Sequence, residues 1–92
     1  EIAPSNIYEA SDGMLIIAAN QDTVFQRLAE AMGEPDLARD PRFSNHTSRG
    51  ENQAELDTLV NQWSSQQKVA DLEALCEKHG VPCGRLYRAP EM

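Results

Sequence analysis

Two short strand-like runs on either side of Ser11-Asp12-Gly13 constrain the fold of this chain more than any other feature of its sequence. Residues 7–10 and 14–19 have the length of strands, and Asp-Gly is typical of a tight hairpin turn because Gly adopts a positive φ without strain. The second run, Met-Leu-Ile-Ile-Ala-Ala, is apolar on both faces of a strand. We therefore expect a β-hairpin whose second strand is central in a sheet and covered on at least one side by helices.

The segment after the hairpin has the pattern of an amphipathic helix. Asp22 or Thr23 is suited to cap its N-terminus, and Thr23 with Gln26 fits a reciprocal capping box. Gly33 suits the left-handed residue that follows a helix, and Pro35 prevents the helix from continuing. Five apolar residues recur at helical spacing and predict the buried face: Val24, Phe25, Leu28, Ala29 and Met32.

An irregular corner is predicted between this helix and the next one. Asp36 is suited to cap about one helical turn, which Asp40-Pro41 ends because the residue before a proline disfavours the helical region. Phe43 is expected to anchor the corner on the core. Another capping-box pair then precedes the next helix: Ser48 and Glu51.

Two further helices and an extended segment complete the pattern. One helix carries four apolar residues on a stripe: Leu56, Leu59, Val60 and Trp63. A second runs from Ser65 to about His79, where Gly80 ends it, and Val81–Tyr87 follows as an extended segment. The order predicts an α+β fold in which a small antiparallel sheet of about three strands, the hairpin plus a C-terminal strand, is packed by three main helices. All 92 residues fit one domain.

Charge and composition argue against several classes of function. The formal net charge of −7 disfavours nucleic-acid binding, because that binding requires Lys and Arg to neutralise phosphates. No apolar run reaches membrane-spanning length, so we expect no membrane partner. The two cysteines are too few for a disulfide framework and lack the spacing of a metal site. We therefore expect no metal and a reducing, cytoplasmic location.

The connection between the second strand and the first helix holds the candidates for substrate binding: Asn20, Gln21 and Asp22. The N–H groups and the dipole of a helix N-terminus receive anions or carbonyls, and the two amide side chains add adaptable hydrogen bonds. In a two-domain enzyme such a loop would face the cleft. In an isolated domain it would only cap the helix.

Arg49 has two interpretations that the sequence leaves open. Its guanidinium fits the carboxylate or phosphate of a ligand, or it ties the corner together by bonding backbone carbonyls or Asp40. No residue of the chain is expected to be catalytic. Cys83 has no base that the sequence places beside it, and Cys76 falls on an apolar helix stripe.

Five segments together resemble the small domain of the family III CoA-transferases, a group that includes formyl-CoA transferase, L-carnitine CoA-transferase and α-methylacyl-CoA racemase. The segments are YEASDGMLIIAA, FQRLAEAMGEPDL, DPRFSNHTSRGEN, ELDTLVNQW and GVPCGRL. They span almost the whole chain in the family's order, and DPRF followed by Arg49, Asn52 and GVPCG is specific as a set. The glycine-rich loop that formyl-CoA transferase carries on this domain has no match.

The resemblance implies a reaction that moves coenzyme A between carboxylic acids. In the transferases an aspartate of the CoA-binding large domain attacks the acyl-CoA thioester to form a mixed anhydride, whereas the racemase exchanges a proton beside the thioester carbonyl. Coenzyme A and acyl-CoA are thereby implied as substrates of the full enzyme, with no cofactor bound by this chain alone. The racemases carry a glutamate where this chain has Asp22, so Asn20 and Asp22 are expected to face the cleft.

The resemblance also implies a lid that closes over the acyl end of the substrate and is inactive alone. Its implied partner is the large domain or a second protomer in a homo-oligomer. We therefore expect self-association or a contiguous apolar patch, involving residues such as Ile2, Ile7, Leu86 and Tyr87. The alternatives are a fragment of a racemase-type enzyme, a free-standing interaction module, and a truncated gene fragment without activity.

Overall fold

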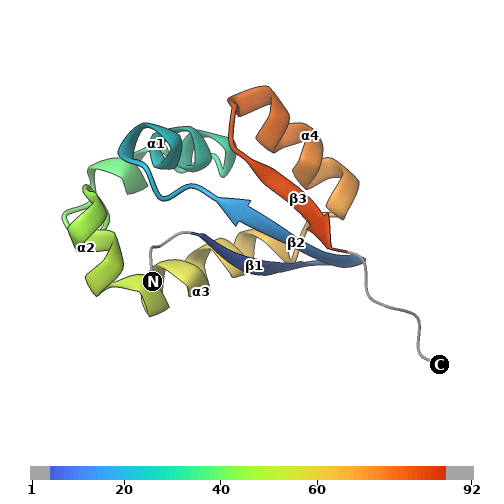
Figure 1. The fold of residues 1–92 in the computed structure, drawn as a ribbon, viewed down its shortest axis with the longest axis horizontal. Helices are drawn as coiled ribbons and strands as arrows, with labels where there is room; N and C mark the ends of the chain where they lie inside the picture. The colour runs from blue at the N-terminus through green and yellow to red at the C-terminus, as the bar shows by residue number, and fades with distance from the viewer. Residues whose placement is uncertain (1–4, 87–92) are drawn as a thin grey trace.

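The computed structural model describes residues 5–86, which form a three-stranded antiparallel sheet with helices packed on it (Figure 1). The α+β fold, the three strands and the three main helices are confirmed. In chain order the elements are β1 (Ser5–Ala10), β2 (Gly13–Ala18), α1 (Asp22–Ala31), the 3-10 helix η1 (Pro35–Arg39), α2 (His46–Glu51), α3 (Gln53–Ser64), α4 (Val69–His79) and β3 (Cys83–Leu86).

The sheet has the strand order β1-β2-β3, so β2 is central as expected. In its antiparallel register Ile16 lies between Ile7 of β1 and Gly84 of β3. Alternate residues of β2 divide between the two faces: Leu15 and Ile17 are fully buried, whereas Ile16 is exposed. The helices pack on the side of Leu15 and Ile17, with α3 beside β1 and α4 beside β3 (Figure 1).

The hairpin is confirmed, but the conformational role expected of Gly13 is wrong. Ala10 pairs with Gly13, so Ser11 and Asp12 form the two-residue turn and Gly13 is the first residue of β2. Within residues 5–86, positive φ occurs only at Gly33 and Gly80. Gly13 serves close packing instead, because a Cβ there would lie 3.0 Å from a side-chain methyl carbon of Val69.

Two glycines do take the left-handed conformation that the sequence predicts at helix ends. Gly33 follows α1 with φ of 75°, and Gly80 ends α4 with φ of 71°. After Gly80 the chain turns back, and the N–H of Val81 donates to the carbonyl of Cys76 at 2.8 Å. This turn directs β3 alongside β2.

The N-terminal caps of α1 and η1 differ from the expected ones. The N-cap of α1 is Gln21, without a side-chain capping bond, and Asp22 is already the first helical residue. The expected caps Asp22 and Thr23 are therefore wrong, and the Asp22 carboxylate accepts from Arg49 instead. The 3-10 helix η1 begins at Pro35, so Asp36 lies inside it and does not cap it.

The caps of α2 and α4 also depend on residues that the sequence patterns did not indicate. Asn45 caps α2, since its Oδ1 accepts the N–H of Ser48 at 2.8 Å, and the expected capping box of Ser48 and Glu51 is wrong. Helix α4 starts at Val69, four residues later than Ser65. The Oδ1 of Asp12, in the hairpin turn, accepts the N–H of Val69 at 2.8 Å. Tertiary contacts therefore set this helix start.

The core lies between the sheet and the helices. Phe43 is fully buried, which confirms its expected role as the anchor of the corner. The buried residues that pack with it in one cluster come from β1, β2, α1, α3 and α4 and from two connections: Tyr8, Leu15, Ile17, Ala19, Phe25, Leu28, Leu56, Val60, Leu72, Cys76 and Val81.

Exposed apolar side chains gather on the other face of the sheet. Ile7 is 48% exposed and Ile16 is 40% exposed, and the two are cross-strand partners. Leu86 is half-buried, while Ile2 and Tyr87 lie outside the described residues. Within residues 5–86, no helix combines the length and apolar character that crossing a membrane requires.

Candidate functional site

The connection Ala19–Gln21 joins the end of the central strand to the start of α1. Ala19 is fully buried, Asn20 is half-buried, and Gln21 and Asp22 are exposed. The carbonyl of Gln21 accepts the N–H of Phe25 at 2.8 Å, which starts the helix directly behind the loop. The structure therefore places the three predicted binding residues, Asn20, Gln21 and Asp22, consecutively on the surface at one end of β2.

The buried guanidinium of Arg49 stabilises the conformation of this loop. Nη2 of Arg49 donates to the carbonyl of Asn20 at 2.9 Å and to Oδ1 of Asp22 at 2.7 Å. Its Nη1 donates to the carbonyl of Phe43 at 3.1 Å, and its Cζ lies 4.8 Å from the centre of the Phe25 ring. One side chain thus joins the loop, the helix start and the corner.

The exposures of the two charged partners differ. The side chain of Arg49 is 1% exposed, whereas that of Asp22 is 60% exposed. Because the guanidinium is enclosed and bound to three protein oxygens, it does not reach a ligand at the surface. The geometry favours the structural interpretation of Arg49 over ligand binding. Of the partners suggested for Arg49, the backbone carbonyls are found; the acid bonded to it is Asp22, whereas Asp40 pairs with Arg42.

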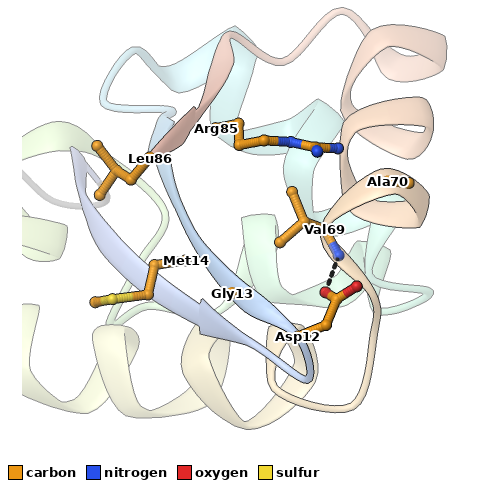
Figure 2. Close-up of a pocket in the computed structure, with 7 residues that line it drawn as sticks. All are labelled: Asp12, Gly13, Met14, Val69, Ala70, Arg85 and Leu86. Atoms are coloured by element: carbon orange, nitrogen blue, oxygen red, sulfur yellow. Dashed lines mark hydrogen bonds between the residues drawn. The ribbon is translucent and has the colours of Figure 1, made fainter. Parts of the chain in front are cut away.

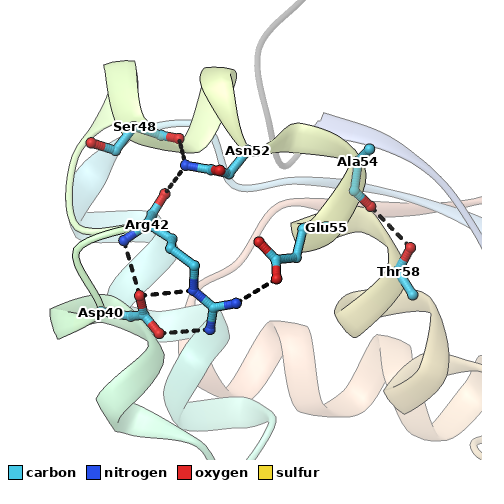
Figure 3. Close-up of polar contacts among 7 residues, drawn as sticks. All are labelled: Asp40, Arg42, Ser48, Asn52, Ala54, Glu55 and Thr58. Atoms are coloured by element: carbon cyan, nitrogen blue, oxygen red, sulfur yellow. Dashed lines mark hydrogen bonds and ion pairs between the residues drawn. The ribbon is translucent and has the colours of Figure 1, made fainter.

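The corner has a second polar network on its exposed side (Figure 3). Arg42 donates from Nη2 to Asp40 Oδ2 at 2.8 Å and from Nη1 to Glu55 Oε2 at 2.5 Å. Hydrogen bonds from the Arg42 side chain and backbone lower the pKa of Asp40 from 3.8 to about 2. Asn52 donates to the carbonyls of Arg42 and Ser48 at 3.1 and 3.0 Å. These hydrogen bonds and ion pairs stabilise the backbone conformation of the corner. Asp40 is ionised at neutral pH.

The two thiols lie together between α4 and β3 and have the properties of packing residues. Cys76 is fully buried, and burial raises the pKa of its thiol to about 12. Burial likewise raises the pKa of Cys83. Because the thiolate is the reactive form, neither residue is prepared for nucleophilic attack at neutral pH.

A hollow lies at the opposite end of β2 from the predicted binding loop. It has a volume of about 740 Å³ and is lined by Asp12, Gly13, Met14, Val69, Ala70, Arg85 and Leu86 (Figure 2). Nη2 of Arg85 donates to Oε1 of Glu73 at 2.6 Å. The sequence patterns gave no signal for this hollow, because the hairpin turn and the start of α4 that border it are 57 residues apart in the chain.

Comparison with known proteins gives consistent matches. The model of "CoA-transferase family III" matches residues 1–92. The succinyl-CoA–D-citramalate CoA-transferase of Chloroflexus aurantiacus is 52% identical over 92 residues, which are 99% of this chain and 23% of that protein. The acetyl-CoA:oxalate CoA-transferase of Acetobacter aceti is 32% identical over 90 residues, 98% of this chain and 23% of that protein.

A solved structure agrees with these relatives. The crystal structure of a CAIB/BAIF family protein from Brucella suis superposes with a TM-score of 0.89 at 38% identity, covering 95% of this chain and 23% of that one. The chain therefore spans about a quarter of the length of the proteins it matches. The sequence match covers the whole chain and the fold match covers 95% of it, and the chain belongs to CoA-transferase family III.

Proposed function

We propose that this chain is the small domain of a CoA-transferase and that it works with a CoA-binding large domain that supplies the nucleophile. The observation that carries this proposal is the match over the entire chain to a relative that is 52% identical and about four times as long. The resemblance of the five sequence segments to a family III small domain and the observed α+β fold both support this proposal. The reaction would transfer coenzyme A from an acyl-CoA to a carboxylic acid.

The chemistry of the described residues supports the view that the chain is not catalytic by itself. A carboxylate nucleophile that forms an anhydride needs a desolvated site from which water is excluded. The buried polar or charged residues among those described are Arg49 and Ser64, and neither is an acid. Asp40 has a lowered pKa, but it is held by Arg42 on the outside of the corner.

We place the binding loop, Asn20–Asp22, at the acyl end of the substrate. Its backbone is fixed by Arg49 at the carbonyl of Asn20, so the loop does not have to be ordered when substrate binds. The side chains of Gln21 and Asp22 are exposed and so are accessible to a facing surface. In this proposal the domain closes over the substrate as a lid and excludes water from the anhydride.

Short dicarboxylic acids are the substrate class that we favour. The relatives named above act on D-citramalate and oxalate, and a further one, from Agrobacterium fabrum, is named succinate–glutarate CoA-transferase and is 29% identical. All four acids carry two carboxylates. These names also favour the transferase over the racemase alternative.

The test uses the complete gene product with succinyl-CoA as donor and citramalate, oxalate or glutarate as acceptor. We expect transfer of coenzyme A to at least one of these acids. The transfer is measured by chromatography of the acyl-CoA products. Racemisation of a 2-methylacyl-CoA without any transfer would contradict the proposal and favour the racemase alternative.

The loop is tested separately with Asn20→Ala and Gln21→Ala in the same protein. Both changes keep the backbone carbonyl that Arg49 binds, so the fold should be retained. We expect kcat/KM to fall about ten-fold or more in at least one variant. The matched control is Gln26→Ala, an exposed residue one turn further along α1, which should leave kcat/KM unchanged. Unchanged kinetics in both loop variants would refute the placement of the loop.

A further inference from the structure

Cys76 and Cys83 are free thiols that lie side by side where the chain passes from α4 to β3. Cys76 belongs to the last turn of α4 and Cys83 is the first residue of β3, and the two elements pack against each other (Figure 1). The S–H of Cys76 donates a hydrogen bond to the sulfur of Cys83. The two sulfurs are therefore in direct contact.

The backbone around the two thiols favours a covalent bond between them. Cys83 pairs with the fully buried Ile17, so its side chain points to the helix side of the sheet, and Cys76 lies on the buried face of α4. A disulfide requires side chains that point toward each other in this way. The N–H of Val81 already donates to the carbonyl of Cys76 at 2.8 Å, which closes the turn between them. Joining the sulfurs therefore calls for a change in side-chain torsions within a turn that is already formed.

The two thiols differ in their access to solvent. Cys76 is fully buried, whereas Cys83 is half-buried. Cys83 also borders a hollow of about 480 Å³ together with four other residues: Glu73, Glu77, Val81 and Pro82. Burial raises the pKa of the Cys83 thiol, and the hydrogen bond from Cys76 offsets part of this rise. A reagent from solvent therefore meets the sulfur of Cys83 first.

The charges at the hollow restrict the kind of reagent that arrives. Its two acids, Glu73 and Glu77, add to the effect of burial and raise the pKa of Cys83 further. They also repel anionic oxidants such as glutathione disulfide, whereas a small neutral peroxide is not repelled. Because the thiolate is rare at neutral pH, even the reaction with a peroxide is slow.

We propose that Cys76 and Cys83 form a redox-active dithiol that hydrogen peroxide converts to a reversible disulfide. The Cys83 thiolate attacks one peroxide oxygen, the O–O bond breaks, and the second oxygen leaves as hydroxide and takes up a proton to become water. This step leaves a sulfenic acid on Cys83. The sulfur of Cys76 then attacks the sulfenic sulfur, and its proton leaves with the hydroxyl group as a second water. The two sulfurs lose the two electrons that the peroxide gains.

The slow first step and the adjacent second thiol indicate protection rather than rapid signalling. A sulfenic acid that meets no thiol is oxidised further to a sulfinic acid, which ordinary thiol reductants do not reverse. A sulfinate on Cys83 would place a negative charge beside the buried Ile17. The contact with Cys76 intercepts the sulfenic acid as a disulfide, from which a thiol reductant restores both residues. This inference does not depend on the proposed transferase reaction.

The test is a peptide map after a graded series of hydrogen peroxide concentrations, in the 92-residue chain and in the complete gene product. The remaining thiols are alkylated and the protein is digested with trypsin. Trypsin cleaves after Lys68, Lys78 and Arg85, so the two cysteines fall in separate peptides, residues 69–78 and 79–85. We expect these two peptides to be recovered joined, with two hydrogens fewer than their sum, and dithiothreitol to return both free.

Two variants test the order of the steps. In Cys76→Ala the sulfenic acid has no partner, so we expect at least five-fold more sulfinic acid on Cys83 than in the parent at the same peroxide concentration. In Cys83→Ala the buried Cys76 should remain reduced over the same series. Circular dichroism before treatment shows whether each variant is folded, and the map of the parent tests the disulfide without either variant.

Several results would overturn the proposal. The first is a parent in which both thiols stay reduced, or in which Cys83 reaches sulfinic acid as fast as in Cys76→Ala without joined peptides. Oxidation of Cys76 in Cys83→Ala as fast as that of Cys83 in Cys76→Ala would contradict the order of attack. Joined peptides that come from a covalent dimer on a non-reducing gel would also overturn it, since the bond would then link two copies of the chain.

Discussion

Replacing Arg49 by methionine should destabilise this domain more than replacing any exposed arginine. The guanidinium of Arg49 is the contact between the loop at Asn20, the corner at Phe43 and the start of α1 at Asp22. Methionine keeps an unbranched apolar stem of similar length but has no donor. The change therefore removes the hydrogen bonds and leaves most of the packing.

The magnitude follows from the partners left behind. The carbonyls of Asn20 and Phe43 each lose a charged donor, and the loss of a hydrogen bond to a charged group costs roughly 1.5–3 kcal/mol. The ion pair with Asp22 adds little, because that carboxylate is 60% exposed and is screened by water. We expect a total loss of about 3 kcal/mol, a large part of the roughly 5–15 kcal/mol that stabilises a typical domain.

The assay is urea denaturation of the 92-residue chain, followed by circular dichroism, with Arg42→Met as the matched control. Arg42 also holds two acids, Asp40 and Glu55, but at the surface, so its loss should cost much less than the loss of Arg49. Arg49→Lys should fall between the two, because one ammonium cannot reproduce the planar fork. Equal losses for Arg49→Met and Arg42→Met would refute the reasoning.

Three further predictions follow from single residues. Hydrogen bonds from the neighbouring guanidinium of Arg42 lower the pKa of Asp40 from 3.8 to about 2, so its stabilising contribution is present above pH 4 and is lost as the pH falls toward 2. Asp40→Asn should therefore flatten the pH dependence of the urea midpoint between pH 4 and pH 2. An unchanged slope would contradict this. Burial raises the pKa of Cys76 to about 12, so the free energy of unfolding should decline above pH 9, where the thiol of the unfolded chain ionises. A disulfide reagent at pH 8 should also label Cys76 far more slowly in the folded than in the unfolded chain. Equal labelling rates would show that the thiol is accessible in the folded chain. Gly13→Ala should cost about 1 kcal/mol in chemical denaturation, because its Cβ would lie 3.0 Å from a valine methyl carbon, whereas Gly84→Ala should be near neutral; the reverse order would contradict the packing.

The elements of the fold were predictable because their signals are local. Apolar spacing in α1, α3 and α4 and the left-handed glycines at positions 33 and 80 are properties of a few adjacent residues. The helix starts were less predictable, because several partners come from distant parts of the chain. Asp12 caps α4 from 57 residues away, and nothing near Ser65 in the sequence indicates that.

In the candidate site, too, features that depend on adjacent residues were predictable and contacts between distant residues were not. The loop at Asn20–Asp22 could be located from the sequence, since it joins an apolar strand to a helix. The partner of Arg49 could not, because Asp40 is near in sequence but Asp22, 27 residues away, is near in space. The exposed apolar pair on the sheet was only partly predicted: Ile7 was expected at the surface, while the exposure of Ile16 follows from its pairing with Ile7 in the strand register.

The most direct test of the central claim is a side-by-side measurement of CoA transfer by the 92-residue chain and by the complete gene product. Both proteins would be assayed at equal molar concentration with succinyl-CoA and the panel of dicarboxylic acids. The account predicts transfer by the complete protein and none above background by the 92-residue chain. Turnover by the 92-residue chain alone would contradict it, because the chemistry would then reside on these residues.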